Sequence, residues 1–143
     1  MPNTLIDTGV WLSLVDPNDG VAPRATVDAI DDLLHGHTIV LPWPVGFETL
    51  RTRLARKRLP MQALERRLKS TKLEWVDDGP YRASALEFTF QAALREGRAL
   101  SMVDCLIRLM LDDLNLRINY LATWNERDFE DVCQPRGIVI LPG

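Results

Sequence analysis

Short apolar segments alternate with longer helical segments along the whole chain, and this alternation limits the possible folds more than any other feature. The short segments are typical of strands because turn residues or charges bound each of them. The segments between them place apolar residues three and four positions apart, as amphipathic helices do. Strands that alternate with helices form a parallel sheet covered on both faces, so we expect an open α/β fold. The predicted strands are 4–6, 38–41, 73–76, 118–122 and 138–141.

The predicted helices have recognisable starts and stops. Thr8 is expected to cap the first helix, directly after the first strand. Pro44 suits the first turn of a helix after the second strand, and Pro60 is expected to break that helix. The apolar stripe of this helix is predicted to be Phe47, Leu50 and Leu54, and further helices are predicted over 23–34, 61–68, 81–95 and 101–114.

The length of the chain matches one ordinary domain, so all 143 residues are expected to fold as a single unit. A hydrophobic content of 46% with 26% charged residues excludes a disordered chain. Cys105 and Cys133 lack Cys-x-x-Cys spacing and are expected to be reduced thiols, which favours a cytoplasmic protein. No apolar run approaches the ~20 residues of a membrane span, and the first residues do not resemble a signal peptide.

The charge is distributed very unevenly along the chain. The net charge is only −3, which by itself argues against a nucleic-acid partner. Residues 51–72, however, contain nine Lys or Arg and a single acid, while the rest of the chain carries a net charge of −11. Such an asymmetry points to a binding surface or to solvated helix faces, and the two interpretations stay open at this stage.

Four acids occupy positions where an open α/β sheet places its functional groups. Asp7 ends the first strand, Glu48 lies in the first turn after the second strand, and Asp128 follows the strand that ends at 122. Asp104 lies in the first turn of the most regular helix, three residues after Ser101. Functional sites in such folds gather beyond the carboxyl ends of the strands, so these acids are the candidate site residues.

Two of these acids also have a structural interpretation. Carboxylates in the first turn of a helix are stabilised by the helix dipole. Asp104 follows Ser101 by three residues and Asp128 follows Asn125 by three residues, which is the spacing of a capping box. On this interpretation both carboxylates only close the start of a helix.

The other two acids are harder to explain by local structure. Glu48 can be an exposed helix acid that pairs with Arg51 or Thr52. Asp7 directly follows an apolar strand and, if buried, needs hydrogen bonds or a metal ion. If the acids converge, their like charges cannot all stay ionised without a counter-charge. A hard divalent cation such as Mg²⁺, with oxygen ligands, is the usual solution.

Several other residues are expected to have structural rather than functional roles. His35 and His37 are far from any cysteine pair and are expected in an exposed turn, so a zinc site is not predicted. Trp11, Trp75 and Phe129 fall within apolar patterns and are expected to pack in the core rather than to stack on bases.

Four segments, taken in order, resemble the motifs of one family. They are Leu5-Ile6-Asp7-Thr8 followed by Trp11, then Glu48, then Leu100-Ser101-x-x-Asp104, and Ala122-Thr123-x-Asn125-x-x-Asp128-Phe129. Together they resemble the PIN-domain ribonucleases, and with the chain length they are most similar to the VapC-type toxins of toxin–antitoxin pairs. The resemblance covers essentially the whole chain.

This resemblance implies a PIN-like three-layer α/β/α sandwich with a central parallel sheet. It also implies cleavage of RNA phosphodiester bonds that depends on Mg²⁺ or Mn²⁺. Asp7, Glu48, Asp104 and Asp128 match the family's metal-binding and catalytic acids.

Other positions of the family motifs are matched or altered. Thr8, Thr123 and Asn125 match polar residues that support the acids, whereas Trp124 departs from the family and is expected to alter the rim of the site. The resemblance also implies an antitoxin partner and a homodimer. The basic segment is then expected to attract RNA, to dock the antitoxin or to contact the second subunit, and its candidate RNA-binding residues are Arg51, Arg53, Arg56, Lys57 and Arg58.

Three other functions fit single features of the sequence. Asp7-Thr8-Gly9 matches the triplet of aspartic proteases, but that site needs an all-β fold. A phosphatase or receiver domain would use Asp7 covalently, and a phosphatase would need a second acid where Gly9 stands. A catalytically silent PIN-like module that binds RNA or a protein is the remaining alternative.

Overall fold

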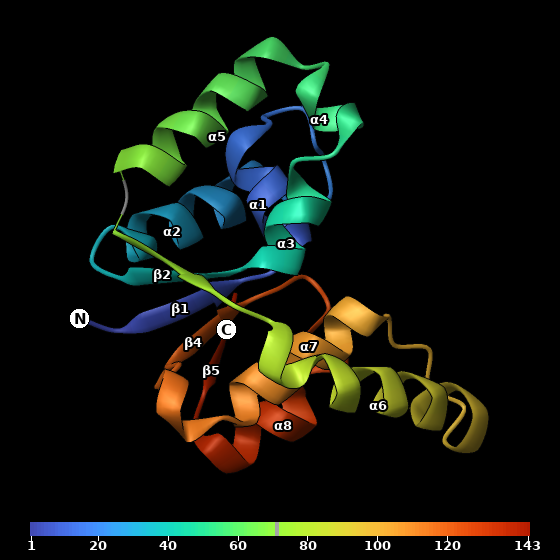
Figure 1. The fold of residues 1–143 in the computed structure, drawn as a ribbon. Coiled ribbons are helices and arrows are strands. Elements are labelled where there is room, and N and C mark those ends of the chain that lie inside the picture. Colours follow the sequence, from blue (N-terminus) through green and yellow to red (C-terminus); the bar gives the residue numbers. More distant parts are fainter. Residues whose placement is uncertain (71) are drawn as a thin grey trace.

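A computed structural model describes residues 1–70 and 72–143, and its centre is a five-stranded sheet (Figure 1). The strand order is β3-β2-β1-β4-β5, and every neighbouring pair is parallel. This arrangement confirms the predicted α/β class with a parallel sheet. The strands are β1 (Asn3–Ile6), β2 (Thr38–Pro42), β3 (Leu73–Val76), β4 (Tyr120–Ala122) and β5 (Val139–Leu141).

Helices cover both faces of the sheet, so the protein has three layers (Figure 1). One layer holds α1 (Thr8–Val15), α2 (Arg24–Leu34), α3 (Trp43–Thr49), α4 (Thr52–Ala55) and α5 (Arg58–Ser70). The opposite layer holds α6 (Arg82–Arg95), α7 (Met102–Asp112) and α8 (Glu130–Arg136). Three 3₁₀ turns join these elements: η1 (Gly79–Tyr81), η2 (Leu114–Leu116) and η3 (Glu126–Asp128).

The strand order places a topological switch point beside β1. The chain builds β1, β2 and β3 outward in one direction and then returns to lay β4 against the other edge of β1. Ile6 of β1 pairs with Ala122 of β4 at the carboxyl ends of both strands. Crevices at such switch points are where open α/β sheets bind their ligands, and Asp7 and Thr123 are the residues that follow these two ends.

The core consists of the apolar side chains between the sheet and its two helical layers. Trp11 of α1 and Phe129 before α8 are almost completely buried, which confirms the core prediction for both. Trp75 of β3 is only half-buried and stacks on the exposed Trp43, with ring centroids 4.0 Å apart. Trp75 therefore packs at the edge of the core rather than inside it.

The predicted helix from Pro44 to Pro60 is wrong in two respects. Phe47 and Leu50 do not form a buried stripe, because the helix ends at Thr49 and the chain restarts as α4. Pro60 does not break a helix but lies in the first turn of α5, where a missing N–H costs no hydrogen bond. The apolar spacing continues beyond the end of α3 at Thr49, so two separate helices were predicted as one.

Two further expectations are corrected. Helix α8 was not predicted because Pro135 lies inside it, and Gly137 closes it with a φ of 66°. His37 is half-buried rather than exposed, since its Nδ1 shares a 2.7 Å hydrogen bond with the Thr4 hydroxyl and its ring lies against Tyr120.

Among the helices that the structure describes, none combines the length and the apolar character needed to cross a membrane.

Candidate functional site

Asp7 lies at the carboxyl end of β1, and its carboxylate is held by groups from two strands. The Thr8 N–H donates to Oδ1 over 2.8 Å, so Asp7 and not Thr8 is the N-cap of α1. The Thr123 hydroxyl, at the end of β4, donates to Oδ2 over 3.0 Å. The Asp7 N–H donates to the Ala122 carbonyl over 2.9 Å. With an exposure of only 8%, this carboxylate is nearly enclosed by the protein.

The electrostatic surroundings of Asp7 oppose its negative charge. Burial raises the pKa of the Asp7 carboxyl, and the charges of Asp104 and Glu48 raise it further. The hydrogen bonds from Thr123 and from the Thr8 N–H act in the opposite direction and lower this pKa. Two of the other predicted acids, Asp104 and Glu48, therefore act on Asp7 at the switch point of the sheet.

The Glu48 side chain is held near Asp7 by Thr8, the residue that follows Asp7 in the sequence. The Thr8 hydroxyl donates to Glu48 Oε1 over 2.8 Å, which joins the start of α1 to α3. The expected pairing with Arg51 or Thr52 is not formed by the carboxylate, because Arg51 donates to the Glu48 main-chain carbonyl instead. The Glu48 side chain thus belongs to the same site as Asp7.

Asp104 forms the capping box that its spacing predicts. The Asp104 N–H donates to Ser101 Oγ, and the Ser101 N–H donates to Asp104 Oδ2, each over 3.0 Å. These bonds hold the carboxylate at the start of α7 without burying it. Because its charge still reaches Asp7, the capping role and a role in the site are compatible.

Asp128 occupies a different environment. The Asn125 side chain does not cap η3, so the capping interpretation of Asp128 is wrong. The main-chain carbonyl of Asp128 accepts hydrogen bonds from Arg108 over 2.7 Å and from Arg98 over 3.2 Å. Its carboxylate charge acts on Arg98, and it is not among the groups that shift the pKa of Asp7. The charges of Glu48 and Asp104 thus reach Asp7, whereas Asp128 is not grouped with these three acids.

Thr123 and Asn125 connect the turn after β4 to the site. The Asn125 N–H donates to Thr123 Oγ1 over 3.0 Å, while the same hydroxyl donates to Asp7. Thr123 is 1% exposed, so its hydroxyl has little access to water. This relay fixes the Asp7 carboxylate through a residue 116 positions away in sequence.

The donor atoms of the site match the preferences of a hard divalent cation. Asp7, Glu48 and Asp104 offer only carboxylate oxygens, and a bound cation would stabilise the Asp7 carboxylate against the burial and the neighbouring charges that raise its pKa. Within residues 1–70 and 72–143, no three His, Cys, Asp or Glu side chains lie close enough together to enclose an ion by themselves. Mg²⁺ commonly binds through one or two carboxylates and keeps several waters, so the donor set fits this ion.

The candidate RNA-binding residues of the basic segment divide between two grooves. A groove of about 310 Å³ is lined by Glu48 together with Arg51, Arg53 and Lys57, and Lys57 donates to the buried Asp16 over 2.8 Å. Arg56 and Arg58 instead line a groove of about 530 Å³ between α4 and α5. Only part of the predicted RNA-binding set therefore adjoins the site, and Thr71 lies outside the described residues.

Trp124 packs on the first helix instead of standing open at the rim. Its Nε1 donates to the Gly9 carbonyl over 3.2 Å and to Ser13 Oγ over 3.1 Å. A Cβ at Gly9 would lie 3.2 Å from Trp124 Cδ1, so glycine permits this close approach. Gly9 and Ser13 were missed as supports of the site because no local pattern signals a contact across 115 residues.

Comparison with known proteins supports the architecture. No family model matches the chain, and no curated protein sequence does so either. The chain is similar in structure to a chain in the crystal structure of VapBC2 from Rickettsia felis bound to a DNA fragment from their promoter. The TM-score is 0.63 over 96% of each chain, with 16% sequence identity. An identity this low shows the fold alone, and the parallel sheet flanked by helices matches a PIN-like fold.

Proposed function

We propose that this protein is a Mg²⁺- or Mn²⁺-dependent endoribonuclease that acts as the toxin of a toxin–antitoxin pair. The observation that supports it most is the buried Asp7 at the switch point of the sheet, whose pKa is raised by burial first and by the charges of Asp104 and Glu48 second. A bound cation would stabilise the ionised form of such a carboxylate, and acids with perturbed pKa values cluster at functional sites. The order of the motifs and the PIN-like fold agree with this function.

In this proposal Asp7 binds the divalent cation directly, and Glu48 and Asp104 bind it either directly or through its coordinated waters. When bound, such a cation lowers the pKa of a coordinated water and offsets the charge that develops on a phosphate. The protein itself supplies the orientation of its ligands: Thr123 and the Thr8 N–H hold Asp7, and the Thr8 hydroxyl holds Glu48. Asp128 is proposed as an outer acid that contacts waters of the site rather than the ion.

The proposed substrate is RNA, and the groove beside Glu48 is proposed to receive its backbone. Arg51, Arg53 and Lys57 line this groove together with the acids Asp16, Asp19 and Glu48, so positive charge lies next to the Glu48 carboxylate. Phosphates are attracted by such cations without any reading of sequence. Because Lys57 already pairs with Asp16, the two arginines are expected to contribute most.

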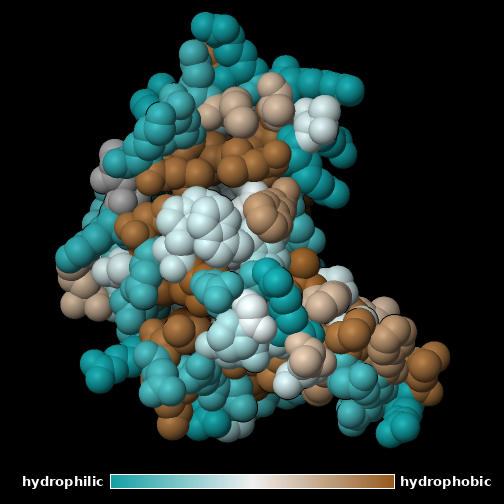
Figure 2. Space-filling view, viewed as in Figure 1, coloured by the Kyte–Doolittle hydropathy of each residue, from teal (hydrophilic) through white to brown (hydrophobic). Residues whose placement is uncertain are grey.

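The proposed protein partner is an antitoxin, because the structural neighbour was crystallised as VapBC2. A homodimer is proposed as well. Three apolar side chains of α6 are exposed at intervals of four residues and lie on one helix face: Leu86, Phe90 and Leu94. Figure 2 shows apolar surface along this helix where it projects from the body of the protein. A second subunit would cover such a face.

The decisive experiment compares RNA cleavage by the wild type with Asp7→Asn and Asp104→Asn, with Mg²⁺ and with EDTA. We expect cleavage by the wild type only with the metal, and a loss of at least 100-fold in each variant. Asp28→Asn is the matched control, since Asp28 is an exposed acid of α2 that pairs with Arg24. Equal activity in all four proteins would refute the assigned site. No cleavage by any of them, combined with retained RNA binding, would favour the silent module.

A further inference from the structure

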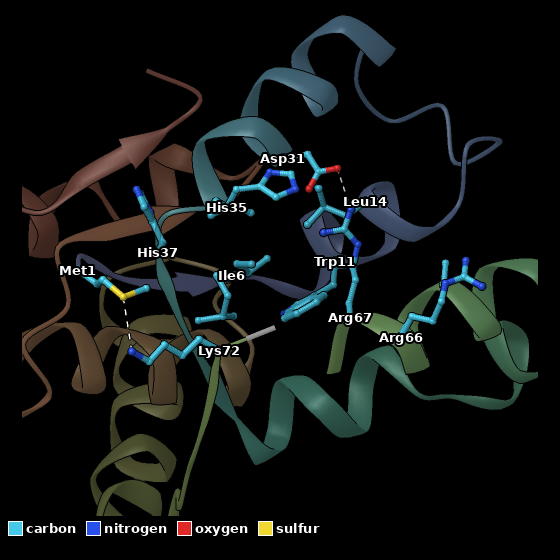
Figure 3. A pocket seen from close by; sticks show the side chains of 13 residues that line it. Met1, Ile6, Trp11, Leu14, Asp31, His35, His37, Arg66, Arg67 and Lys72 are labelled. Atoms are coloured by element: carbon cyan, nitrogen blue, oxygen red, sulfur yellow. Dashed lines mark hydrogen bonds and ion pairs between the residues drawn. The ribbon is translucent and has the colours of Figure 1, made fainter. Parts of the chain in front are cut away.

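A large pocket lies away from the carboxylates of the candidate site. It has a volume of about 600 Å³ and is formed by side chains of α1, α2 and α5 over the sheet (Figure 3). Met1, His37 and Lys72, which precede β1, β2 and β3, line one side of it. None of the three acids of the candidate site lines this pocket. We propose that it binds a small organic anion with an apolar body, such as a medium-chain carboxylate.

The inner part of the pocket is apolar and suited to the body of such a ligand. It is lined by the buried side chains of Ile6, Trp11, Leu14, Leu34 and Ile39. A volume of about 600 Å³ falls within the range of small-molecule sites, and burial of a hydrocarbon chain against these side chains is favourable.

Trp11 provides an unused hydrogen-bond donor in this pocket. Its side chain is 2% exposed, and its Nε1 has no hydrogen-bond partner in the described structure. In Figure 3 the Trp11 ring lies among the labelled side chains that surround the pocket. An indole N–H can only donate, and a buried donor without an acceptor is unfavourable. A ligand oxygen that reached this atom would satisfy it.

The polar lining is predominantly cationic. Arg66, Arg67 and Lys72 line the pocket, and Asp31 is the one acid among the described lining residues. Arg67 is paired with Asp31 over 2.8 Å. Lys72 Nζ donates to the Met1 thioether over 3.5 Å, and a thioether is a weak acceptor. A carboxylate would replace that weak contact by a charge-assisted hydrogen bond.

An amphipathic anion would match all three features of the pocket. Its body would contact the apolar interior, and its charged end would pair with the indole N–H and the cations. A neutral hydrocarbon would satisfy only the interior, and an inorganic anion would satisfy only the cations. This site is independent of the proposed nuclease activity, so the failure of one does not decide the other.

The test is a titration with octanoate followed through the indole N–H signals in nuclear magnetic resonance spectra. The protein has four tryptophans, and Trp11→Phe identifies the signal of Trp11. We expect octanoate to shift the Trp11 signal downfield in a saturable way, because the N–H gains an acceptor. We expect the neutral 1-octanol to bind at least 10-fold more weakly. An unmoved Trp11 signal, or equal affinity for the two probes, would overturn the proposal.

A pair of variants tests the location. Ala63→Leu places three additional carbons in a residue that lines the pocket, and we expect octanoate affinity to fall at least 10-fold. Ala83→Leu on the exposed surface of α6 is the matched control and is expected to bind like the wild type. Unchanged affinity in Ala63→Leu would place octanoate elsewhere and refute the assigned site.

Discussion

The hydroxyl of Thr123 is predicted to stabilise the folded protein by stabilising the ionised form of Asp7. Thr123→Val keeps the shape of the side chain but removes the donor to Asp7 Oδ2. A hydrogen bond to a charged group contributes about 1.5–3 kcal/mol. The Asn125 N–H also loses its acceptor, but Asn125 is exposed and water replaces it. We therefore expect the free energy of unfolding to fall by about 2 kcal/mol at pH 8 without metal.

The pH dependence separates this mechanism from a simple packing defect. The Thr123 hydrogen bond lowers the pKa of Asp7, so its removal raises that pKa further above the ordinary value of 3.8. A group whose pKa is raised on folding contributes stability that is complete below its unfolded pKa and is lost as the pH rises through its folded pKa. The deficit of Thr123→Val relative to the wild type is therefore expected to be small near pH 4 and to grow towards pH 8.

Urea unfolding in EDTA, repeated between pH 4 and pH 8, measures this deficit. Thr123→Ser is the control, because it keeps the hydroxyl and loses a buried methyl group, at a cost of about 1 kcal/mol that does not depend on pH. A deficit for Thr123→Val below about 0.5 kcal/mol, or one that is equal at both ends of the pH range, would refute the reasoning.

Two further outcomes test the support and the charge of the site. Gly46→Ala places a Cβ 2.8 Å from Trp75 Cζ3. We expect this variant to lower the free energy of unfolding by about 1–2 kcal/mol and to reduce RNA cleavage by moving α3. Gly36→Ala is the control, because its Cβ meets no atom within 4 Å, and it is expected to be neutral in both assays. In a cleavage-deficient background, Arg53→Glu is expected to weaken RNA binding. The slope of log binding constant against log salt concentration is expected to become shallower by roughly 0.7 or more. Arg95→Glu at the end of α6 is the control. An unchanged slope for Arg53→Glu would remove the groove from the RNA path.

Much of the fold could be predicted because it depends on residues close in sequence. The five strands and most helices follow from apolar spacing, and the capping box of Ser101 and Asp104 follows from a spacing of three. Errors occurred where tertiary packing overrides the local pattern. Phe47 is apolar and correctly spaced, yet it is exposed because the helix ends two residues later and the core is filled by other side chains.

The candidate site could be predicted only in part. The positions of Asp7 and Glu48 after strands are visible in the sequence, but the Thr8 hydroxyl that joins them is a contact across 40 residues. The division of the candidate RNA-binding residues between two grooves was also invisible, because it depends on the direction in which α4 and α5 leave α3. The unpaired indole N–H of Trp11 has no signature in sequence at all.

The sequence by itself determined the class of fold, the order of its elements and the identity of the acids at the ends of strands. Periodicity and end signals act over three or four residues, so they are encoded locally. Only the tertiary structure decided which acids meet, how deeply Asp7 is buried and which donors hold it. Burial and like-charge repulsion depend on every segment that surrounds a group, and those segments are brought together only when the sheet has formed.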